Sequence, residues 1–197
     1  MGFRYVWSRP DLKAILLMLF LIGTFGLNFP IFISTMAVRV FHADAGGYGL
    51  LSSIMAIGTT AGALLAAGRD KPAFASLLTG AAIFGLGCTP AAIAPNYWLF
   101  ATALAIIGAA ALTFTNATNS LMQLSTGPAM RGRVMALRIG IALGCTPIGA
   151  PIVGWVAAHP GPRGSLGVGA ISGLIAAVMA LRAMNLLRAT APDPNSA

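Results

Sequence analysis

The chain has 197 residues, of which 57% are hydrophobic and 8% are charged, and its mean hydropathy is +0.85. Because soluble domains carry about 25% charged residues, this composition excludes a soluble globular domain and predicts an integral membrane protein. The formal net charge of +8 is what an excess of lysine and arginine on the cytoplasmic side of such a protein produces. With no basic helix face interleaved with aromatics, we expect no nucleic-acid partner.

Residues that could carry out catalysis are few. Glutamate is absent, and the four carboxylates, Asp11, Asp44, Asp70 and Asp193, fall between or outside the apolar runs. The two cysteines lie in separate apolar segments without metal-ligand spacing, and no phosphate-binding glycine loop followed by lysine is present. We therefore expect no enzymatic activity, no metal and no cofactor.

Uncharged runs predict an all-α, polytopic membrane protein. A bilayer core of about 30 Å requires about 20 helical residues. Runs of that size, divided at proline, glycine and charge clusters, predict one bundle over residues 14–188 with six spans, at residues 14–40, 46–68, 72–92, 97–125, 132–158 and 164–187. The first run is too long for a signal-peptide core, so we interpret it as a true span. Residues 1–13 and 189–197 remain as terminal segments.

The distribution of cations predicts the orientation. One side of the predicted bundle carries Arg4, Arg9, Lys13, Arg69, Lys71, Arg131, Arg133, Arg182 and Arg188, whereas the other carries Arg39 and Arg163. Cytoplasmic loops are enriched in lysine and arginine. We therefore expect a multi-pass protein of the plasma (cytoplasmic) membrane with both termini in the cytoplasm and the lipid bilayer as its surroundings.

Prolines and small residues indicate how the helices pack. Pro30 should kink the first helix, and Pro147 and Pro151 the fifth. Stretches such as GTTAGALLAAG, residues 58–68, are rich in the small residues that let helix backbones approach closely in lipid.

The fourth predicted helix contains the most polar stretch within the spans, TFTNATNSLMQL, residues 113–124. Asn116, Asn119 and Gln123 are spaced i, i+3, i+7, and Ser120 extends the same face. An unpaired amide facing hydrocarbon costs several kcal/mol, so this face should point into the bundle. Two readings remain open: hydrogen bonds between helices, or the lining of a substrate cavity.

The first predicted helix carries a second, shorter polar stripe. Thr24 and Asn28 are spaced i, i+4, with Phe29 and Phe32 close by. Aromatic rings beside an amide suit an amphipathic ligand. Phenylalanines at helical spacing are more often part of a core or in contact with lipid. This stripe therefore also has two readings: core or lipid contact, or the lining of a substrate cavity.

The segment MRGRVMALR, residues 130–138, concentrates three arginines. We predict that Arg131, Gly132 and Arg133 form the cytoplasmic turn between the fourth and fifth helices, as a topological anchor or as a hinge and gate. Arg138 lies two turns deeper, where it would reach a helix C-terminus or a carboxylate such as Asp70. With no acid or histidine inside the spans, the chain has no obvious proton carrier.

Three segments together resemble the second half of major facilitator superfamily transporters: GFRYVWSRPDLKAILLM at residues 2–18, GGYGLLSSIMAIGTTAGALLAAG at 46–68 and GPAMRGRVMALRIGIALGCTPIGAPIVGWVA at 127–157. GYGLL and RGRVM, followed by Pro147, Gly149 and Gly154, are most similar to the drug:proton antiporter subgroup that includes macrolide efflux proteins and the enterobactin exporter. The loop GRDKP, residues 68–72, resembles a reduced form of the family's cytoplasmic-loop motif.

The resemblance implies that the six helices correspond to helices seven to twelve, a three-plus-three inverted repeat, and that the first and fourth helices line the translocation path. It also implies an efflux-type transporter half that moves a small amphipathic compound, of drug or siderophore class, by alternating access. Such a half would need an N-terminal half or a second copy as its partner. The alternative is a truncated, non-transporting membrane remnant or accessory subunit. No ring of charges supports a channel.

Overall fold

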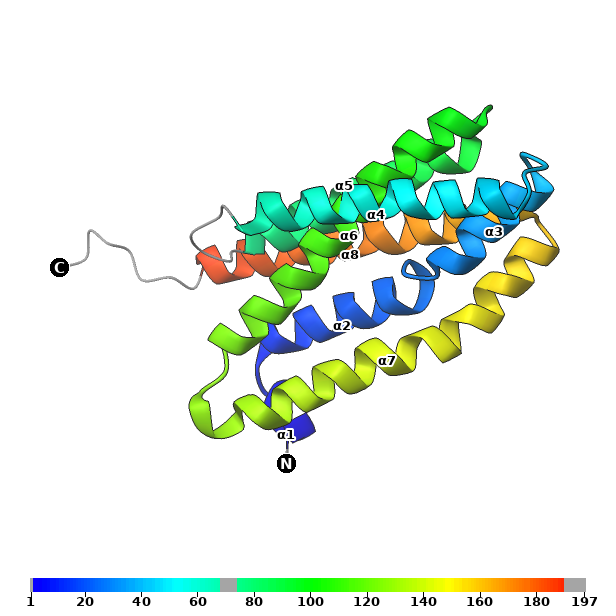
Figure 1. Cartoon of the computed structure of the whole chain (residues 1–197). Helices are drawn as coiled ribbons and strands as arrows, with labels where there is room; N and C mark the ends of the chain where they lie inside the picture. The colour runs from blue at the N-terminus through cyan, green and yellow to red at the C-terminus, as the bar shows by residue number, and fades with distance from the viewer. Residues whose placement is uncertain (1, 68–73, 190–197) are drawn as a thin grey trace.

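The computed structural model describes residues 2–67 and 74–189. In this part of the chain all regular structure is helical, which confirms the all-α prediction (Figure 1). The helices are α1 (Gly2–Trp7), α2 (Pro10–Phe25), α3 (Phe29–Arg39), α4 (Ala45–Ala67), α5 (Phe74–Ile93), α6 (Tyr97–Leu124), α7 (Pro128–Ala158) and α8 (Pro162–Ala189).

Six segments of the described chain are long and apolar enough to cross a membrane, as the sequence predicted. The first of them joins α2 and α3 into one segment, Pro10–Arg39, and each of the other five corresponds to one long helix. The chain is therefore an integral, multi-pass membrane protein.

The first span is interrupted near its middle, where the sequence predicted one helix with a kink. The amides of Gly26 and Leu27 both donate to the carbonyl of Ile22, at 2.7 and 2.9 Å, which closes α2. Pro30 occupies the first turn of α3 and has no N–H to donate to the carbonyl four residues earlier. The backbone breaks just before this proline, over residues 26–28, and not at it.

Several helices begin at a different residue from the one predicted. The segment 1–13, expected to be a simple terminal segment, contains the short helix α1 and the first turn of α2. The fifth span begins at Pro128 and not at residue 132, because proline suits the first turn of a helix. Consequently Arg131, Gly132 and Arg133 lie within α7, and the connection from α6 is confined to residues 125–127.

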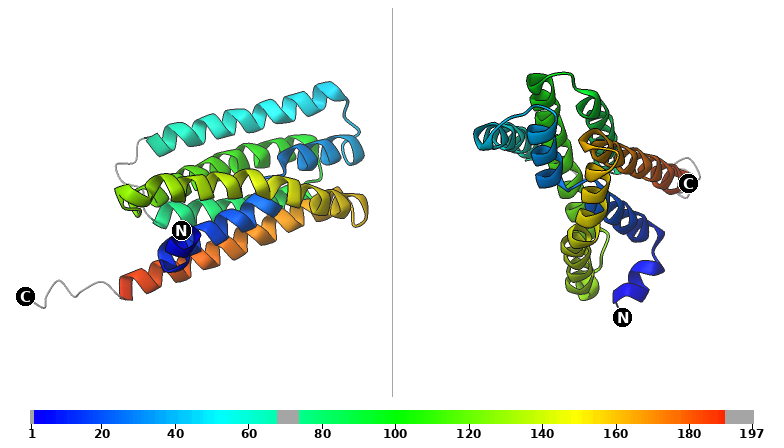
Figure 2. Two further views of the ribbon diagram at one scale, coloured as in Figure 1. Left: turned by 90° about the horizontal axis from the view of Figure 1, so that it is seen from below. Right: turned by 90° about the vertical axis from the view of Figure 1, so that its right-hand side faces the viewer.

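The helices fall into a packed centre and two outlying members. Helix α5 packs extensively on α8 and α6, α4 packs on α6, and α2 packs on α7 and α8. In end view α4 and α7 project from the rest of the bundle (Figure 2). In the most apolar stretch of α4, and likewise in that of α7, 17% of the residues are buried. In the corresponding stretches of the other spans the share is 50–56%. Large sides of α4 and α7 are therefore uncovered.

Glycines set the closest helix contacts. A Cβ atom added at Gly62 of α4 would lie 2.7 Å from the backbone of Ala109 on α6, and one at Gly85 of α5 would lie 2.7 Å from the backbone of Leu174 on α8. Real Cβ atoms do not approach backbone this closely, so a side chain at either position would separate the helices. The small residues of the spans thus allow the close approach that the sequence predicted.

Both ends of the described chain lie at the same end of the bundle, where Pro10 and Leu186 line one groove. We call this the terminal end, and the opposite one the far end. At the far end two arginines donate to carbonyls that follow or end a helix: Arg39 to Ala157 at 2.9 Å and Arg163 to Ala94 at 3.3 Å. These carbonyls lack intrahelical partners, so the cations stabilise the helix ends.

Candidate functional site

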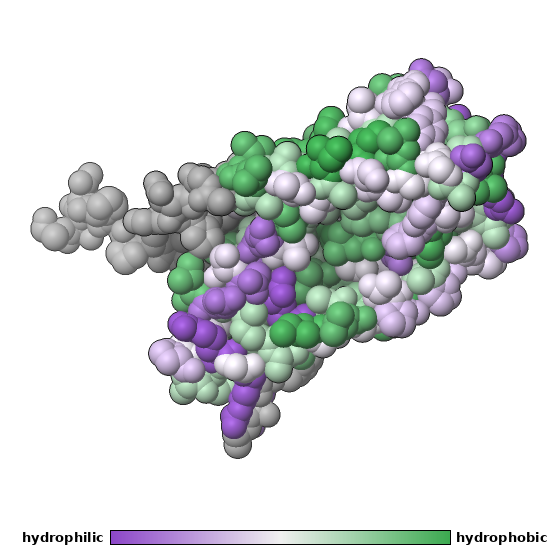
Figure 3. All heavy atoms as spheres, viewed as in Figure 1, coloured by the Kyte–Doolittle hydropathy of each residue, from purple (hydrophilic) through white to green (hydrophobic). Residues whose placement is uncertain are grey.

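The polar stripe of α6 lies at the surface of the bundle and is not covered by neighbouring helices. Asn116 and Gln123 are exposed, and Asn119 and Ser120 are partly buried. Asn116 is eight residues before the end of α6, about 12 Å along the helix axis. Hydrophilic residues gather from the terminal end of α7 along α6 in the space-filling view (Figure 3). An exposed amide at that depth requires water, a ligand or another protein surface.

Arg138 lies beside this stripe. It is ten residues beyond Pro128, about 15 Å along α7, and its Nη2 donates to the carbonyl of Thr115 at 3.1 Å. The same nitrogen reaches the hydroxyl of Thr118 at 3.5 Å, while the buried Nε has no hydrogen-bond partner among the described residues. These partners are neutral groups inside α6, whereas a carboxylate or a helix end was expected. Asp70 lies outside the described residues, and its pairing with Arg138 stays a prediction.

Thr24 and Asn28 lie at the break between α2 and α3. Both are buried, with 1% and 2% of their surfaces exposed. The Nδ2 of Asn28 donates to the carbonyl of Thr24 at 2.7 Å, so it replaces a backbone donor that the break removed. The Oδ1 of Asn28 and the hydroxyl of Thr24 have no partner within the described structure. The pair therefore combines a structural role with two unused polar atoms.

The aromatic residues beside this break pack in the core. Phe32 is buried and its ring lies edge-on to that of Phe29, with centroids 6.4 Å apart. Phe29 in turn contacts the ring of Phe84 on α5, with centroids 6.2 Å apart. The ring of Phe32 also faces Gly169 of α8. This placement matches the core reading of the phenylalanine stripe, so Phe32 does not line an open cavity in this conformation.

Helix α7 borders both polar regions without joining them. Its Gly149 meets the backbone of Thr24, and its Cys145 lies against Gly23 of α2. Arg138, nearer the terminal end of α7, contacts α6. The structure thus brings Arg138 to the α6 stripe, but no described contact links that stripe to Asn28.

The predicted hinge residues are exposed in the first turns of α7. Arg131, Gly132 and Arg133 are all exposed, and nothing lies within 4 Å of a Cβ built at Gly132. The expectation that these three residues form the turn itself was wrong, because Pro128 starts the helix earlier. The gating role of the arginines stays a prediction.

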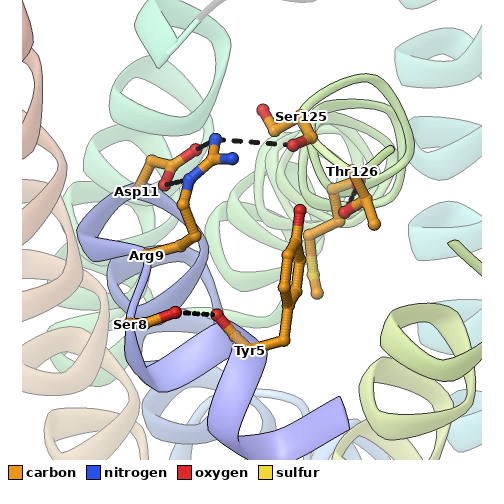
Figure 4. Close-up of polar contacts among 7 residues, drawn as sticks. Tyr5, Ser8, Arg9, Asp11, Ser125 and Thr126 are labelled. Atoms are coloured by element: carbon orange, nitrogen blue, oxygen red, sulfur yellow. Dashed lines mark hydrogen bonds and ion pairs between the residues drawn. The ribbon is translucent and has the colours of Figure 1, made fainter. Parts of the chain in front are cut away.

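A polar cluster at the terminal end was not predicted. Arg9 forms a two-pronged ion pair with Asp11, at 2.8 and 3.0 Å, and also donates to the carbonyl of Ser125 at 3.4 Å (Figure 4). The hydrogen bonds that Arg9 donates to the Asp11 carboxylate raise the pKa of Arg9 above its ordinary value. The cluster links the start of α2 to the end of α6. A sequence signal existed in the RPD triplet, where proline opens a helix between two opposite charges.

Within the described residues no group of three or more histidine, cysteine or acidic side chains is placed to hold a metal ion. The candidate functional features are instead exposed carboxamides, one arginine inside a span and a broken helix. Broken helices and intramembrane charges occur where transporters bind and move solutes.

Comparison with known proteins agrees with this geometry. The sequence pattern of the Major Facilitator Superfamily matches residues 4–197, nearly the whole chain. No curated protein and no solved structure shows significant similarity to it. Six spans with no strand in the described part are consistent with one half of that fold, and the family is one of membrane transporters. The chain belongs to the Major Facilitator Superfamily.

Proposed function

We propose that the chain is one half of an efflux-type secondary transporter and moves a small amphipathic compound, of drug or siderophore class, by alternating access. The strongest support is the exposed amide of Asn116, which lies about 12 Å along the helix axis from the end of α6. Moving an unpaired amide into hydrocarbon costs roughly 2–7 kcal/mol, so lipid is not its partner. A solvated cavity satisfies the amide and offers it to a substrate.

Arg138 supports the same assignment. An arginine inside a span is costly unless it faces water or a polar partner, and here its partners are the neutral oxygens of Thr115 and Thr118. We propose that the guanidinium faces the same cavity as Asn116 and pairs with an anion from the second half or from the substrate. The chain itself has no acid in the described part of that region.

The uncovered sides of α4 and α7 support the requirement for a partner. Exposed apolar residues on α7 alternate with glycines that have open space around them: Ile139, Leu143, Ile148 and Ile152, with Gly140 and Gly144. Open small residues allow a second helix to approach closely. We propose that a second six-helix half docks here, with both termini of this chain in the cytoplasm. A second copy of the chain would offer the same helices.

Efflux measured in cells tests the function. The chain is expressed together with the polypeptide encoded immediately upstream, and the export of ethidium, an amphipathic fluorescent compound, is followed after energisation. Replacing Asn116 by the similarly sized leucine removes the amide and should lower the export rate about tenfold, the value of one amide hydrogen bond of about 1.4 kcal/mol.

Thr79→Ala is the matched control, because Thr79 is also an exposed polar residue within a span, but its hydroxyl bonds the carbonyl of Ser76 in its own helix. This variant should export at the wild-type rate. Equal export by Asn116→Leu and the wild type would contradict the cavity. Absence of export from every combination of halves, including two copies of this chain, would favour the non-transporting accessory role.

A further inference from the structure

A groove of about 470 Å³ lies at the terminal end, between the first turns of α2 and the last turns of α8. This volume is within the 300–1,000 Å³ typical of small-molecule sites. Its walls are mainly apolar, and they are formed by Ala14, Leu17, Met179, Ala183 and Leu186. Neither Asn116 nor Arg138 lines the groove, so it is separate from the proposed translocation path.

The charged residues that line the groove have a net positive charge. Lys13 and Arg182 contribute to it, one from each helix, and so does Asp11. Both oxygens of Asp11 are already occupied by Arg9, at 2.8 and 3.0 Å. Arg182 has no hydrogen bond or ion pair with the described residues, and Lys13 lies 4.6 Å from the ring centre of Trp7. Two cations therefore line the groove, and the one carboxylate beside them, Asp11, is paired with Arg9.

The two cations and the apolar residues Leu17 and Met179 lie at different depths along α2 and α8, as the headgroup and acyl chains of a lipid do in a bilayer leaflet. Lys13 lies in the first turn of α2, and Leu17 lies one turn further along, about 6 Å deeper. On α8, which runs the opposite way, Arg182 lies nearer the end of the helix than Met179. Trp7, beside Lys13, is a residue typical of the membrane interface. Lys13 and Arg182 thus stand nearer the membrane surface than Leu17 and Met179, as a lipid headgroup stands above its acyl chains.

We propose that this groove binds one molecule of an anionic phospholipid. Its phosphate lies between Lys13 and Arg182, and one acyl chain lies against Leu17 and Met179. A free phosphate ion would use the two cations but none of the apolar wall, whereas a zwitterionic lipid would bring its own cation to them. The bound lipid would join the start of α2 to the end of α8 and stabilise that end of the fold.

Native mass spectrometry of the full chain, purified in detergent, tests the proposal. Dioleoylphosphatidylglycerol should bind as one tightly held molecule, about tenfold tighter than dioleoylphosphatidylcholine, because two cations near the surface act on its charge. The double variant Lys13→Gln with Arg182→Gln should lose this preference. The double variant Arg131→Gln with Arg133→Gln removes the same charge at the same end of the bundle and should keep it. An equal loss in both double variants would overturn the proposal.

Ala183→Trp tests the apolar wall separately, since it fills the groove and leaves both cations. It should displace the tightly bound lipid. Competition by inorganic phosphate at millimolar concentration distinguishes the source of the anion: full displacement of phosphatidylglycerol would assign the site to a free phosphate and overturn the lipid.

A measurement without variants covers the case in which a substitution prevents folding. Phosphatidylglycerol with a photoreactive acyl chain is bound to the wild-type chain, irradiated and mapped by peptide sequencing. Adducts should fall within residues 10–17 and 179–186. Adducts spread over all lipid-facing helices would contradict a specific site.

Discussion

The hydrogen-bond partners of Arg138 within the described chain satisfy its guanidinium only in part. Its Nη2 donates to the carbonyl of Thr115, which is already an acceptor in the α6 helix, and its buried Nε donates to nothing described. Hydrogen bonds to neutral oxygens solvate a guanidinium only in part, and an opposite charge or water is normally added. We propose that a second half or a substrate supplies the opposite charge to this guanidinium in an assembled transporter.

Replacing Arg138 by alanine should therefore abolish export while leaving membrane insertion unchanged. Arg138→Lys keeps the charge but replaces the planar guanidinium by a compact ammonium on a shorter side chain, and should retain a reduced export rate, about tenfold below the wild type. Export and the amount of protein in the membrane are measured side by side. A parallel fall in both quantities for Arg138→Ala would show that the arginine is needed for insertion and not for the transport cycle.

At the scale of elements, α7 is attached to the bundle by one narrow stripe. Its buried residues beyond the terminal half are Cys145, Gly149, Val153 and Ala157, spaced four apart along one side. The contact is close because Gly149 has no side chain where it meets the carbonyl of Thr24. Most of the remaining surface of α7 is exposed, which fits the proposed docking of a second half.

Gly149→Ala should destabilise the isolated chain. The added methyl group overlaps the backbone of Thr24, which cannot move away as a flexible side chain could, so about 1–3 kcal/mol of stability should be lost. Gly144→Ala is the matched control, since a Cβ there meets nothing within 4 Å. Unfolding of the two purified variants in detergent, followed by circular dichroism, gives the comparison. Equal midpoints would contradict the close contact between α2 and α7.

The elements differ in how far the sequence predicts them. Lengths of uncharged runs predicted the spans, because a bilayer imposes them. The break over residues 26–28 was missed, because it depends on whether the side chain of Asn28 takes over the carbonyl of Thr24, a contact that spacing does not reveal. The start of α7 was missed because the charged residues 131–133 were interpreted as a loop, although Pro128 already favours a helix start.

The sequence likewise predicted only part of the candidate site. Periodicity identified the face that Asn116, Asn119 and Gln123 share, since side chains three or four apart lie together. It did not identify the neighbour of that face, and Thr115 and Thr118, which meet Arg138, were not singled out. For Phe32 the pattern allowed both core and cavity and favoured core or lipid contact, and the packing against Phe29 and against Gly169 of α8 agrees with the core.

At the scale of the whole molecule, the chain is a packed group of helices with two uncovered arms. Helices α5, α6 and α8 form the packed centre, and α4 and α7 project from it (Figure 2). The exposed amide of Asn116, the arginine of α7 and the open glycines Gly140 and Gly144 are explained together if a second half covers these arms. A substrate cavity then forms between two walls, of which this chain supplies one.

Site-specific photo-crosslinking tests that claim most directly. Benzoylphenylalanine is placed at Leu143 of α7, which is 72% exposed, or at Leu86 of α5, which is 61% exposed, in the chain coexpressed with a tagged second half and, separately, with a tagged copy of itself. Position 143 should form a covalent adduct with one of these two polypeptides, whose mass identifies the partner, and position 86 should form none. Export without any adduct at position 143, or equal adducts at both positions, would contradict the account.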